Sequence, residues 1–459
     1  MLQLLIILIS IITVALSQVA PSYHPYSLIY SEIELSTAQL TVGDEDIYIN
    51  FTENAQITIR PDGTIYRLAL QFDGIKSGHI SIIDWQVPVD AILFIFNDTN
   101  SYTGPYLSIT GEEFYSGRFK SDKIIFEYFE PANSEFAGNF KIDRILPDYN
   151  SPSSSIIVTH IMKINSNRER PKIMVTGYWP PTNEMVRHFS KNIELNPEGW
   201  QGGNWEDLGY DVVSFFPEFN PADCNNCGQG YGDLEVDYRD FSQDFWPIVE
   251  DINPVGIITF SRGSNDMSWE LENRLVNRTN WIDDYMSPLL PTPNPPDDTV
   301  SNYHVRYTSL PVDEIINAIF DAQLGLDAYL DNTNAGMFLS EFAGYHGVWY
   351  KENYDEDIEK PCFSGGHIHV GGQVNWETAK AAAEVSIRTL IHYVDQFILI
   401  LGDCNGDGEV NTLDVVALTG AILGNLELTS LQTQAADMDG NDLLNILDII
   451  AIVNIILDW

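Results

Sequence analysis

Short runs of alternating apolar and polar residues fill the chain from about Tyr23 to Ile145. A period of two, rich in β-branched and aromatic residues, is typical of β-strands. Turn-forming segments such as Pro61-Asp62-Gly63 and Asn97-Asp98-Thr99 recur between these runs. The pattern predicts an all-β sandwich, rather than a parallel sheet, at residues 18–165. We expect three of its strands at residues 46–51, 56–59 and 123–129.

The pattern changes after a polar, turn-rich stretch that we take as a domain boundary. Candidates for short buried strands, at residues 173–176 and 256–260, now alternate with candidates for amphipathic helices, at residues 312–324 and 378–394. Strands that alternate with helices indicate an α/β domain. We place this domain at residues 170–400.

The N-terminus carries a different signal. Residues 1–17 contain an apolar run that ends in Ala15-Leu16-Ser17, which predicts a secretory signal peptide. No Lys or Arg precedes the run, so an N-terminal membrane anchor stays the alternative. The late apolar run at 446–457 is interrupted by Asp448 and Asn454 and is not expected to cross a bilayer. We therefore expect a secreted protein, extracellular or attached to a cell surface, without stable membrane insertion.

Charge and cysteine content narrow the choice of partners. The 459 residues carry a net charge of −43 and include four cysteines. Such an acidic chain is not expected to bind nucleic acid or anionic membranes, because both require Lys and Arg to neutralise phosphates. Four cysteines are too few for a disulfide scaffold, and Cys224 and Cys227 are expected to form a local disulfide in an exported protein. Cys362 and Cys404 stay unassigned.

A loop of oxygen-bearing residues occurs twice near the C-terminus. It begins at Asp403 and again at Asp437, and each copy leads into an apolar segment of helical length. Such spacing wraps a chain segment around a cation that takes six to eight oxygen ligands. Gly408 occupies the sharp turn of the first loop, whereas Asp442 replaces that glycine in the second, which we expect to bind more weakly. The pattern predicts two structural calcium ions, with candidate ligands Asp403, Asn405, Asp407, Glu409, Asn411, Asp414, Asp437, Asp439, Asn441, Leu443, Asn445 and Asp448.

The duplicated loops resemble the type I dockerin, and the resemblance covers residues 402–459. It implies a small α-helical module that folds on calcium and docks onto cohesin domains, often in the context of polysaccharide breakdown. The residues that would contact the partner are Thr412-Leu413 and Ile446-Leu447. The alternative is a calcium module that caps the fold or mediates self-association.

The α/β region holds candidates for hydrolytic chemistry, which needs a nucleophile, a base and a group that orients the base. Residues 334–342 predict a turn followed by a helix, which places Ser340 near a helix N-terminus, where backbone N–H groups can stabilise an oxyanion. Helix capping is the alternative role of Ser340. His367 and His369 lie two residues apart on a predicted strand, and we expect them to face opposite sides, so that only one points into a given cleft.

The same region resembles pyroglutamyl peptidase I, the pyrrolidone carboxyl peptidases. The resemblance covers about residues 173–393, apart from an apparent insertion at 191–244. Five segments occur in the order of that family: Val175-Thr176-Gly177-Tyr178-Trp179-Pro180, Met267 to Asn277, Thr308-Ser309-Leu310-Pro311, Ala335 to Ser340, and Gly366 to Val370. The resemblance implies an α/β/α fold and a peptidase or amidohydrolase.

Position by position, the resemblance implies that Glu272 orients, His369 acts as general base and Ser340 is the nucleophile. The family has cysteine at the place of Ser340. Two interpretations stay open: a serine variant that performs acyl transfer, or an inactive relative that serves as an extracellular binding or scaffold-attached surface protein. Residues 179–183 depart from the family's pyroglutamyl-binding loop. The expected substrate is therefore a peptide or a blocked N-terminus without specificity for pyroglutamate. A cleft walled by Tyr178 and Trp179 would accept a cyclic or aromatic group, and core packing is the alternative role of these two residues.

Two other arrangements compete for the same residues. Glu270 lies two residues before Glu272, and the sequence leaves open which of them meets His369. A third class of site is zinc held by Cys224, Cys227, His367 and His369. It is disfavoured because the two pairs lie far apart in sequence.

Overall fold

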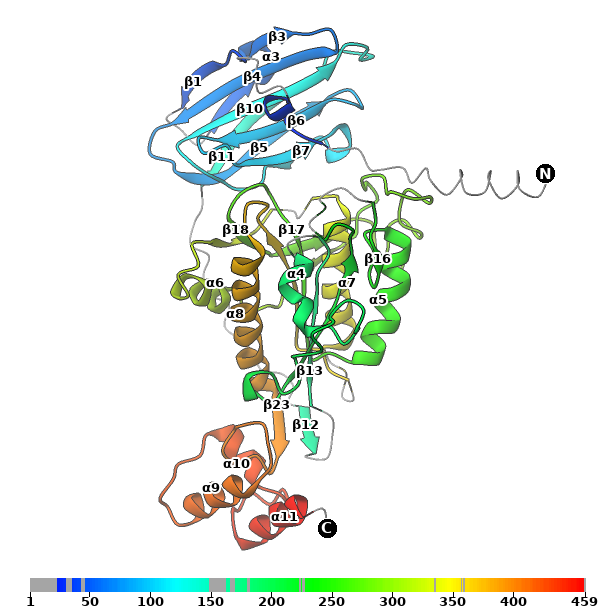
Figure 1. The fold of residues 1–459 in the computed structure, drawn as a ribbon. Coiled ribbons are helices and arrows are strands. Elements are labelled where there is room, and N and C mark those ends of the chain that lie inside the picture. Colours follow the sequence, from blue (N-terminus) through cyan, green and yellow to red (C-terminus); the bar gives the residue numbers. More distant parts are fainter. Residues whose placement is uncertain are drawn as a thin grey trace, which may run out of the picture.

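The computed structural model describes residues 23–29, 35–42, 46–147, 162–165, 170–179, 182–222, 224, 228–333, 336–355, 357 and 360–457. The predicted signal peptide at residues 1–17 lies outside these ranges. Figure 1 shows three bodies in sequence order along the molecule: a strand-rich region, a central region of strands and helices, and a small helical C-terminal region. Within the described ranges, no helix has the length and apolar character needed to span a bilayer.

Two β-sheets make up the N-terminal region. One has the strand order β1-β4-β10-β6-β7 with β3 paired to β4, and the other has the order β2-β11-β5-β8 with β9 paired to β5. The strands are β1 (Ala38–Val42), β2 (Asp46–Asn50), β3 (Gln56–Ile59), β4 (Gly63–Phe72), β5 (Ser77–Gln86), β6 (Ile92–Asn97), β7 (Tyr102–Tyr106), β8 (Phe114–Tyr115), β9 (Phe119–Lys120), β10 (Lys123–Pro131) and β11 (Asn139–Pro147). The short helices are α2 (Tyr26–Ile29), α3 (Phe51–Asn54) and η1 (Ser108–Thr110). The strand-rich N-terminal region is as the alternating pattern predicts.

The two N-terminal sheets share one apolar core. Alternate residues of β4 and β10 on the first sheet, and of β5 and β11 on the second, contribute to a single buried cluster. Phe51, at the start of α3, is fully buried and stacks on Phe140 with ring centroids 4.4 Å apart. Because side chains alternate between the two faces of a strand, this arrangement leaves the outer faces free for polar residues.

A six-stranded sheet forms the centre of the second region. Its order is β14-β13-β17-β22-β18-β21, in which β22 and β18 are antiparallel and the other neighbours are parallel. The strands are β13 (Lys172–Thr176), β14 (Asp211–Phe215), β17 (Gly256–Arg262), β18 (Ser268–Glu272), β21 (Asp327–Asp331) and β22 (Ser364–Val370). Two smaller ladders join β15 (Pro217–Glu218) to β16 (Tyr231–Gly232) and β19 (Arg274–Val276) to β20 (Val305–Tyr307).

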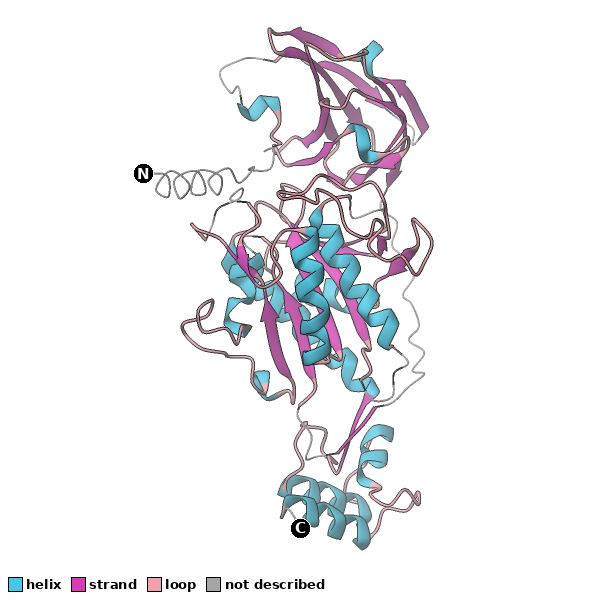
Figure 2. Cartoon of the chain, turned by 90° about the vertical axis from the view of Figure 1, so that its right-hand side faces the viewer, coloured by secondary structure: helices cyan, strands magenta, loops and turns pink. Residues whose placement is uncertain are grey.

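Helices cover both faces of this sheet, as Figure 2 shows. The helices α4 (Thr182–Val186), α6 (Val312–Asp321) and α8 (Trp376–Val394) share one buried cluster with the sheet, and α5 (Tyr238–Ile252) and α7 (Leu339–Tyr354) share another. Short 3₁₀ turns lie at η2 (Arg187–Phe189), η3 (Trp205–Asp207) and η4 (Asp395–Phe397). The α/β class is confirmed, and the predicted helices at 312–324 and 378–394 are α6 and α8.

The apparent insertion at residues 191–244 is not a separate addition to the fold. It contains β14, an edge strand of the central sheet that pairs in parallel with β13. Val212 and Val213 of this strand are almost completely buried. The segment therefore belongs to the core of the region, although its sequence matches no motif.

The C-terminal region follows a short two-stranded link, in which β12 (Met162–Asn165) pairs in parallel with β23 (Ile398–Leu401). Three helices follow, α9 (Thr412–Ile422), α10 (Ser430–Ala436) and α11 (Ile446–Ile456). Ala417, Leu418, Ala436, Ile452 and Cys404 form its small buried core. Such a small core is expected to need further stabilisation.

Candidate functional site

Glu272 and His369 form a buried hydrogen-bonded pair in the central sheet. Glu272 ends β18, and His369 lies near the end of the neighbouring antiparallel strand β22. His369 Nδ1 lies 2.6 Å from Glu272 Oε1, and the two residues are 5 % and 1 % exposed. Glu270 Oε2 lies 3.9 Å from the same nitrogen. Both glutamates therefore face His369, and Glu272 is the closer of the two.

Burial determines the protonation of this pair. It lowers the pKa of His369 to about 4, against the opposing effects of Glu341 and Asp331. Burial also raises the pKa of Glu272, with the charges of Asp331 and Glu341 adding to the effect. The low-dielectric surroundings favour the neutral imidazole, which is the form that can accept a proton.

The expectation that His367 and His369 face opposite sides of their strand is wrong. Their ring centroids lie 4.6 Å apart at an interplanar angle of 88°. Residues two apart on a strand point to the same face, so both rings lie on the side that α7 covers. His367 is fully buried and held by Thr259 Oγ1 and Ser261 Oγ, each 2.8 Å from a ring nitrogen.

Ser340 is the second residue of α7. Phe338 occupies the N-cap position without a side-chain hydrogen bond, so Ser340 does not cap the helix. The first hydrogen bond of the helix runs from Phe342 N–H to Phe338 O, which leaves the preceding N–H groups of the first turn outside the helical pattern. Ser340 is half-buried, and within the described residues its hydroxyl makes no hydrogen bond to His369.

Glycines let α7 lie close against β22 and fix its level along the strand. A side-chain carbon on Gly365 would lie 2.8 Å from Lys351 Cβ, and one on Gly344 would lie 2.7 Å from His367 Cγ. The helix and the strand therefore run in opposite directions. One helical turn advances about 5.4 Å and two strand residues about 6.6 Å, so Ser340, one turn before Gly344, lies at about the level of His369.

The start of α7 is anchored by a buried ion pair that the motifs do not reveal. Glu341 is completely buried and accepts hydrogen bonds from Val276 N–H and Arg278 Nη2, both at 3.1 Å. Arg278 is 7 % exposed. In the sequence, only a glutamate directly after Ser340 and an arginine directly after Asn277 could have indicated this ion pair. The pair fixes the turn that carries Ser340.

The zinc site of two cysteines and two histidines, which the sequence already disfavours, does not form among the described residues. Cys224 is disulfide-bonded and is therefore no metal ligand. Cys227 lies outside the described residues, so its pairing with Cys224 stays a prediction. Cys362 and Cys404 are free and buried.

The N-terminal region contacts the central region beside the Glu272–His369 pair. Tyr102 and Asn265 form an antiparallel bridge, and Arg118 and Lys120 bind Asp327 at 2.5 and 2.8 Å. Asn265 lies in the loop between β17 and β18. The first region therefore packs against the loops that lead into the site.

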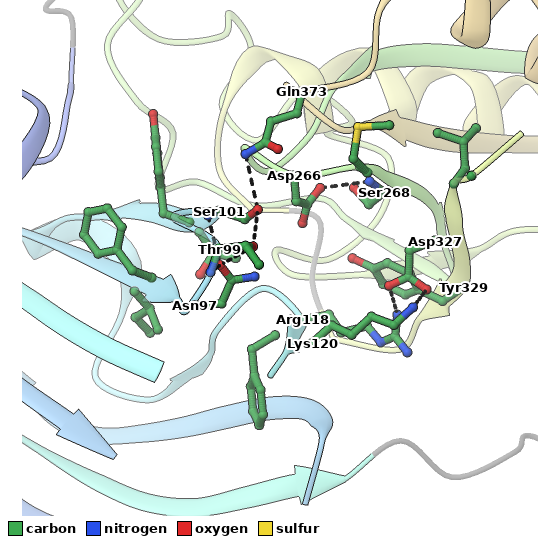
Figure 3. Close-up of a pocket in the computed structure, with 18 residues that line it drawn as sticks. Asn97, Thr99, Ser101, Arg118, Lys120, Asp266, Ser268, Asp327, Tyr329 and Gln373 are labelled. Atoms are coloured by element: carbon green, nitrogen blue, oxygen red, sulfur yellow. Dashed lines mark hydrogen bonds and ion pairs between the residues drawn. The ribbon is translucent and has the colours of Figure 1, made fainter. Parts of the chain in front are cut away.

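A cavity of about 360 Å³ lies where the N-terminal and central regions meet. Figure 3 shows Ser101, Arg118 and Lys120 on one side and Asp266, Asp327 and Gln373 on the other. Asp266 and Ser268 precede Glu270 along the chain, and Gln373 follows His369. The cavity is thus lined by both regions and adjoins the segments that carry the buried pair.

The two aromatic residues expected to wall a cleft have different surroundings. Tyr178 is 1 % exposed and belongs to the buried cluster beneath α5 and α7. Trp179 is half-buried, and its ring stacks on that of Phe219 with centroids 5.9 Å apart. Core packing therefore accounts for Tyr178, and only Trp179 keeps surface for a ligand.

The first C-terminal loop folds around its own carboxylates. Asp403 accepts hydrogen bonds from the N–H groups of Gly406, Asp407 and Gly408. Asp403, Asp407 and Asp414 each bring one oxygen to within 4.8 Å of the others. Burial raises the pKa of Asp403 to about 6, and the charges of Asp414 and Asp407 act in the same direction.

The remaining candidates of the first loop have several partners. Asn405 Nδ2 donates to Asp407 Oδ2 at 2.8 Å, and Asn411 caps α9 by accepting from Leu413 N–H. The Glu409 side chain points toward the central region, where its carboxylate lies 3.4 Å from Asn204 Nδ2. At this loop position the backbone carbonyl is the expected ligand, so the outward side chain leaves the pattern intact.

The second loop also brings three carboxylates together. Asp437, Asp439 and Asp448 each bring one oxygen to within 4.8 Å of the others. Asn445 caps α11 by accepting from Leu447 N–H, and Asn441 accepts from the N–H of Leu443, whose side chain is exposed. Asp442 adopts φ 61° where Gly408 of the first loop has φ 81°. The turn is therefore made without glycine.

Comparisons with known proteins match two parts of the chain. Residues 401–457 match the Dockerin type I domain. Among curated proteins, none matches this sequence. Solved structures similar to it include a mutant pyrrolidone carboxyl peptidase from Pyrococcus furiosus, with 16% identity, a TM-score of 0.35, and coverage of 48% of this chain and 99% of that one.

Two further structures are similar to the same degree. Pyroglutamyl peptidase I from Bacillus amyloliquefaciens has 15% identity and a TM-score of 0.35, and 49% of this chain covers 98% of it. Pyrrolidone carboxyl peptidase from Thermococcus litoralis has 16% identity and a TM-score of 0.35, with 49% and 96% covered. The chain thus combines a region similar to pyrrolidone carboxyl peptidases with a C-terminal match to the type I dockerin domain.

Proposed function

We propose that the central region is a peptide or amide hydrolase that uses Ser340, His369 and Glu272. The observation that carries the proposal is the buried 2.6 Å contact between His369 Nδ1 and Glu272 Oε1. In this arrangement Glu272 Oε1 accepts a hydrogen bond from His369 Nδ1–H, which keeps the proton on Nδ1 and leaves Nε2 unprotonated. The neutral imidazole then serves as a general base.

Ser340 supplies the nucleophile in this proposal. Its Oγ attacks the carbonyl carbon of an amide while its proton moves to His369 Nε2. The imidazolium then protonates the leaving amine, and the C–N bond breaks to leave an acyl-serine. Water, deprotonated by the same imidazole, releases the acid and restores Ser340. The free N–H groups of the first turn of α7 would stabilise the oxyanion.

Serine at this position makes the base indispensable. A thiol beside a histidine can ionise before reaction, whereas a hydroxyl keeps its proton until the transition state. The proposal therefore depends on Ser340 approaching His369 when a substrate binds. The shared level of Ser340 and His369 along α7 and β22 supports such an approach.

The experiment is labelling with a fluorophosphonate probe followed by mass spectrometry. We expect a covalent adduct on Ser340 in the native chain and none in Ser340→Ala or His369→Ala. Saturable binding of a peptide ligand without any adduct on Ser340 would favour the second candidate function, an inactive relative that retains a binding pocket. The observation that favours this candidate is the lack of a hydrogen bond between Ser340 and His369 in the described structure.

We propose that the C-terminal region binds two calcium ions. Three carboxylates converge in each loop, where they repel one another unless a cation lies between them. The residues fit calcium because the ligands are oxygens from Asp, Asn and backbone carbonyls. The match to the type I dockerin domain supports the same ion.

The same region is proposed to dock onto a cohesin-type protein. Leu413, Ile446 and Leu447 are 58 %, 62 % and 59 % exposed. These apolar side chains begin the two helices that follow the loops, and Thr412 beside them is exposed as well. Large exposed apolar side chains gathered on one small region are typical of a protein-binding surface.

A calcium-dependent pull-down with a cohesin domain tests the docking proposal. We expect capture in calcium, loss in chelator, and loss in a variant with Asp403→Ala and Asp437→Ala. A chain that binds calcium but captures no cohesin would leave these loops a structural role only. Attachment through this region fits the proposed secretion of the chain, whose signal segment at residues 1–17 can be tested by N-terminal sequencing of the exported protein.

A further inference from the structure

Three groups able to ligate a metal meet within the central sheet. Glu270, Glu272 and His369 each offer one ligand atom, and these atoms all lie within 4.8 Å of one another. The three residues are 5 %, 1 % and 5 % exposed. They come from two adjacent strands, β18 and β22, whose antiparallel register sets Glu270 opposite His369. The cluster is therefore built on rigid elements rather than on loops.

The charge of this cluster is not balanced by cationic side chains. Asp331, 2 % exposed, ends the neighbouring strand β21 and adds a third carboxyl group. Arg278 pairs with Glu341 instead. Within the described ranges, no Lys or Arg forms an ion pair with Glu270 or Glu272. Buried carboxylates require a paired charge, a bound proton or a metal ion.

A buried oxygen of the cluster has no hydrogen-bond partner. Glu272 Oε1 is bound to His369 Nδ1, but Glu272 Oε2 is buried and makes no hydrogen bond. Buried polar atoms are nearly always satisfied by protein, water or an ion. Glu272 Oε2 is therefore free to bind a ligand beside His369.

We propose that Glu270, Glu272 and His369 bind a divalent transition metal ion of the zinc class. Carboxylate oxygens and an imidazole nitrogen are ligands that zinc accepts, and three protein ligands leave one position for water. His369 would bind through Nδ1 after losing the proton that this nitrogen shares with Glu272. The C-terminal loops offer side-chain oxygens only, which favour calcium, so excess calcium keeps them occupied while zinc is added.

A metal bound to His369 Nδ1 and the proposed hydrogen bond from His369 Nδ1–H to Glu272 exclude each other. A metal on His369 Nδ1 takes the place of the proton through which Nδ1 donates its hydrogen bond to Glu272, so bound zinc would inhibit the enzyme. This consequence rests on the proposed hydrolase function. Binding of the ion does not, and it is tested without any measurement of activity.

The experiment is a zinc titration by calorimetry on the full chain without an affinity tag, in excess calcium to occupy the C-terminal loops. We expect one zinc ion per chain, and at least about 10-fold weaker binding in Glu270→Gln and in His369→Gln. Glu377→Gln, an exposed carboxylate on the first turn of α8, is the matched control and should bind as the native chain does. The double variant Asp403→Ala, Asp437→Ala should also keep its zinc ion.

Anomalous scattering from zinc-soaked crystals of the native chain locates the ion even if a variant fails to fold. A peak among Glu270, Glu272 and His369 supports the proposal. A peak at another histidine, or zinc binding by a folded Glu270→Gln variant as tight as that of the native chain, overturns it. Absence of zinc binding in the titration overturns it as well.

Discussion

At the scale of single residues, the proposed activity depends on how Glu272 orients His369. Their 2.6 Å contact fixes the ring and its tautomer, while Glu270 stands 3.9 Å away. The sequence left open which glutamate meets His369, because two residues two apart on one strand share a face. The answer depends on the register of β18 against β22, which no local pattern carries.

Substitution of Glu272 tests this role directly. Glu272→Gln keeps the size of the side chain but replaces the carboxyl group that accepts the hydrogen bond from His369 Nδ1 with an amide. We expect the rate of Ser340 labelling by a fluorophosphonate to fall about 10³- to 10⁴-fold, while the chain stays folded. The rate is measured by intact-mass spectrometry over time. Glu377→Gln serves as control, and equal labelling of Glu272→Gln and the native chain would refute the role.

At the scale of elements, the placement of α7 against β22 decides where Ser340 lies. The turn and helix were predictable from residues 334–342, because glycine precedes an apolar run. The distance of the helix from the sheet was not predictable, because it depends on contacts of Gly344 and Gly347 with side chains of strands distant in sequence. The same holds for β14, whose burial arises from pairing with β13 rather than from a motif.

Alanine substitutions at the two glycines separate contact from helix propensity. An alanine in a helix interior gains about 1 kcal/mol over glycine. At Gly344 the new carbon would lie 2.7 Å from His367 Cγ, and overpacking costs about 1–3 kcal/mol. At Gly347 the nearest atom, Thr259 Cγ2, is 3.1 Å away and calls for a smaller shift.

We therefore expect Gly344→Ala to lower the free energy of unfolding and Gly347→Ala to leave it nearly unchanged. Urea denaturation measures both. Because Gly344→Ala pushes α7 from β22, it should also slow the labelling of Ser340. If the two variants are equally stable and label equally fast, the close packing of α7 does not position the site.

At the scale of the whole molecule, the C-terminal region touches the central region through its first calcium loop. Gly408 approaches Gly209 so closely that a side-chain carbon on Gly408 would lie 2.8 Å from Gly209 Cα. The duplicated loops could be predicted from the spacing of their residues, because a cation requires ligands at fixed positions along the loop. The contact between loop and central region could not, since it joins residues remote in sequence.

Two glycines in left-handed conformation test this contact. Gly408 has φ 81° and Gly440 has φ 70°, so alanine costs about 1–2 kcal/mol of backbone strain at either position. Only Gly408→Ala also meets the backbone of Gly209, whereas nothing lies within 4 Å of a carbon on Gly440. We expect the larger loss of thermal stability in Gly408→Ala, measured by calorimetry. Equal losses would mean that the contact does not stabilise the molecule.

Removal of calcium should unfold the C-terminal region and leave the central sheet folded. In chelator, the carboxylates of both loops repel one another, and their small core holds few apolar residues. We expect loss of the helical signal of residues 402–457 and of cohesin capture, with the labelling of Ser340 retained. Hydrogen exchange with mass spectrometry resolves the two regions. Loss of exchange protection across the central sheet in chelator would contradict independent folding.

The most direct test of the proposed hydrolase is the reaction of Ser340 with a fluorophosphonate in the native chain. We expect one covalent adduct, mapped to the peptide that contains Ser340 and absent from His369→Ala. An unmodified Ser340 in a folded chain, under conditions where a known serine hydrolase is fully labelled, would contradict it.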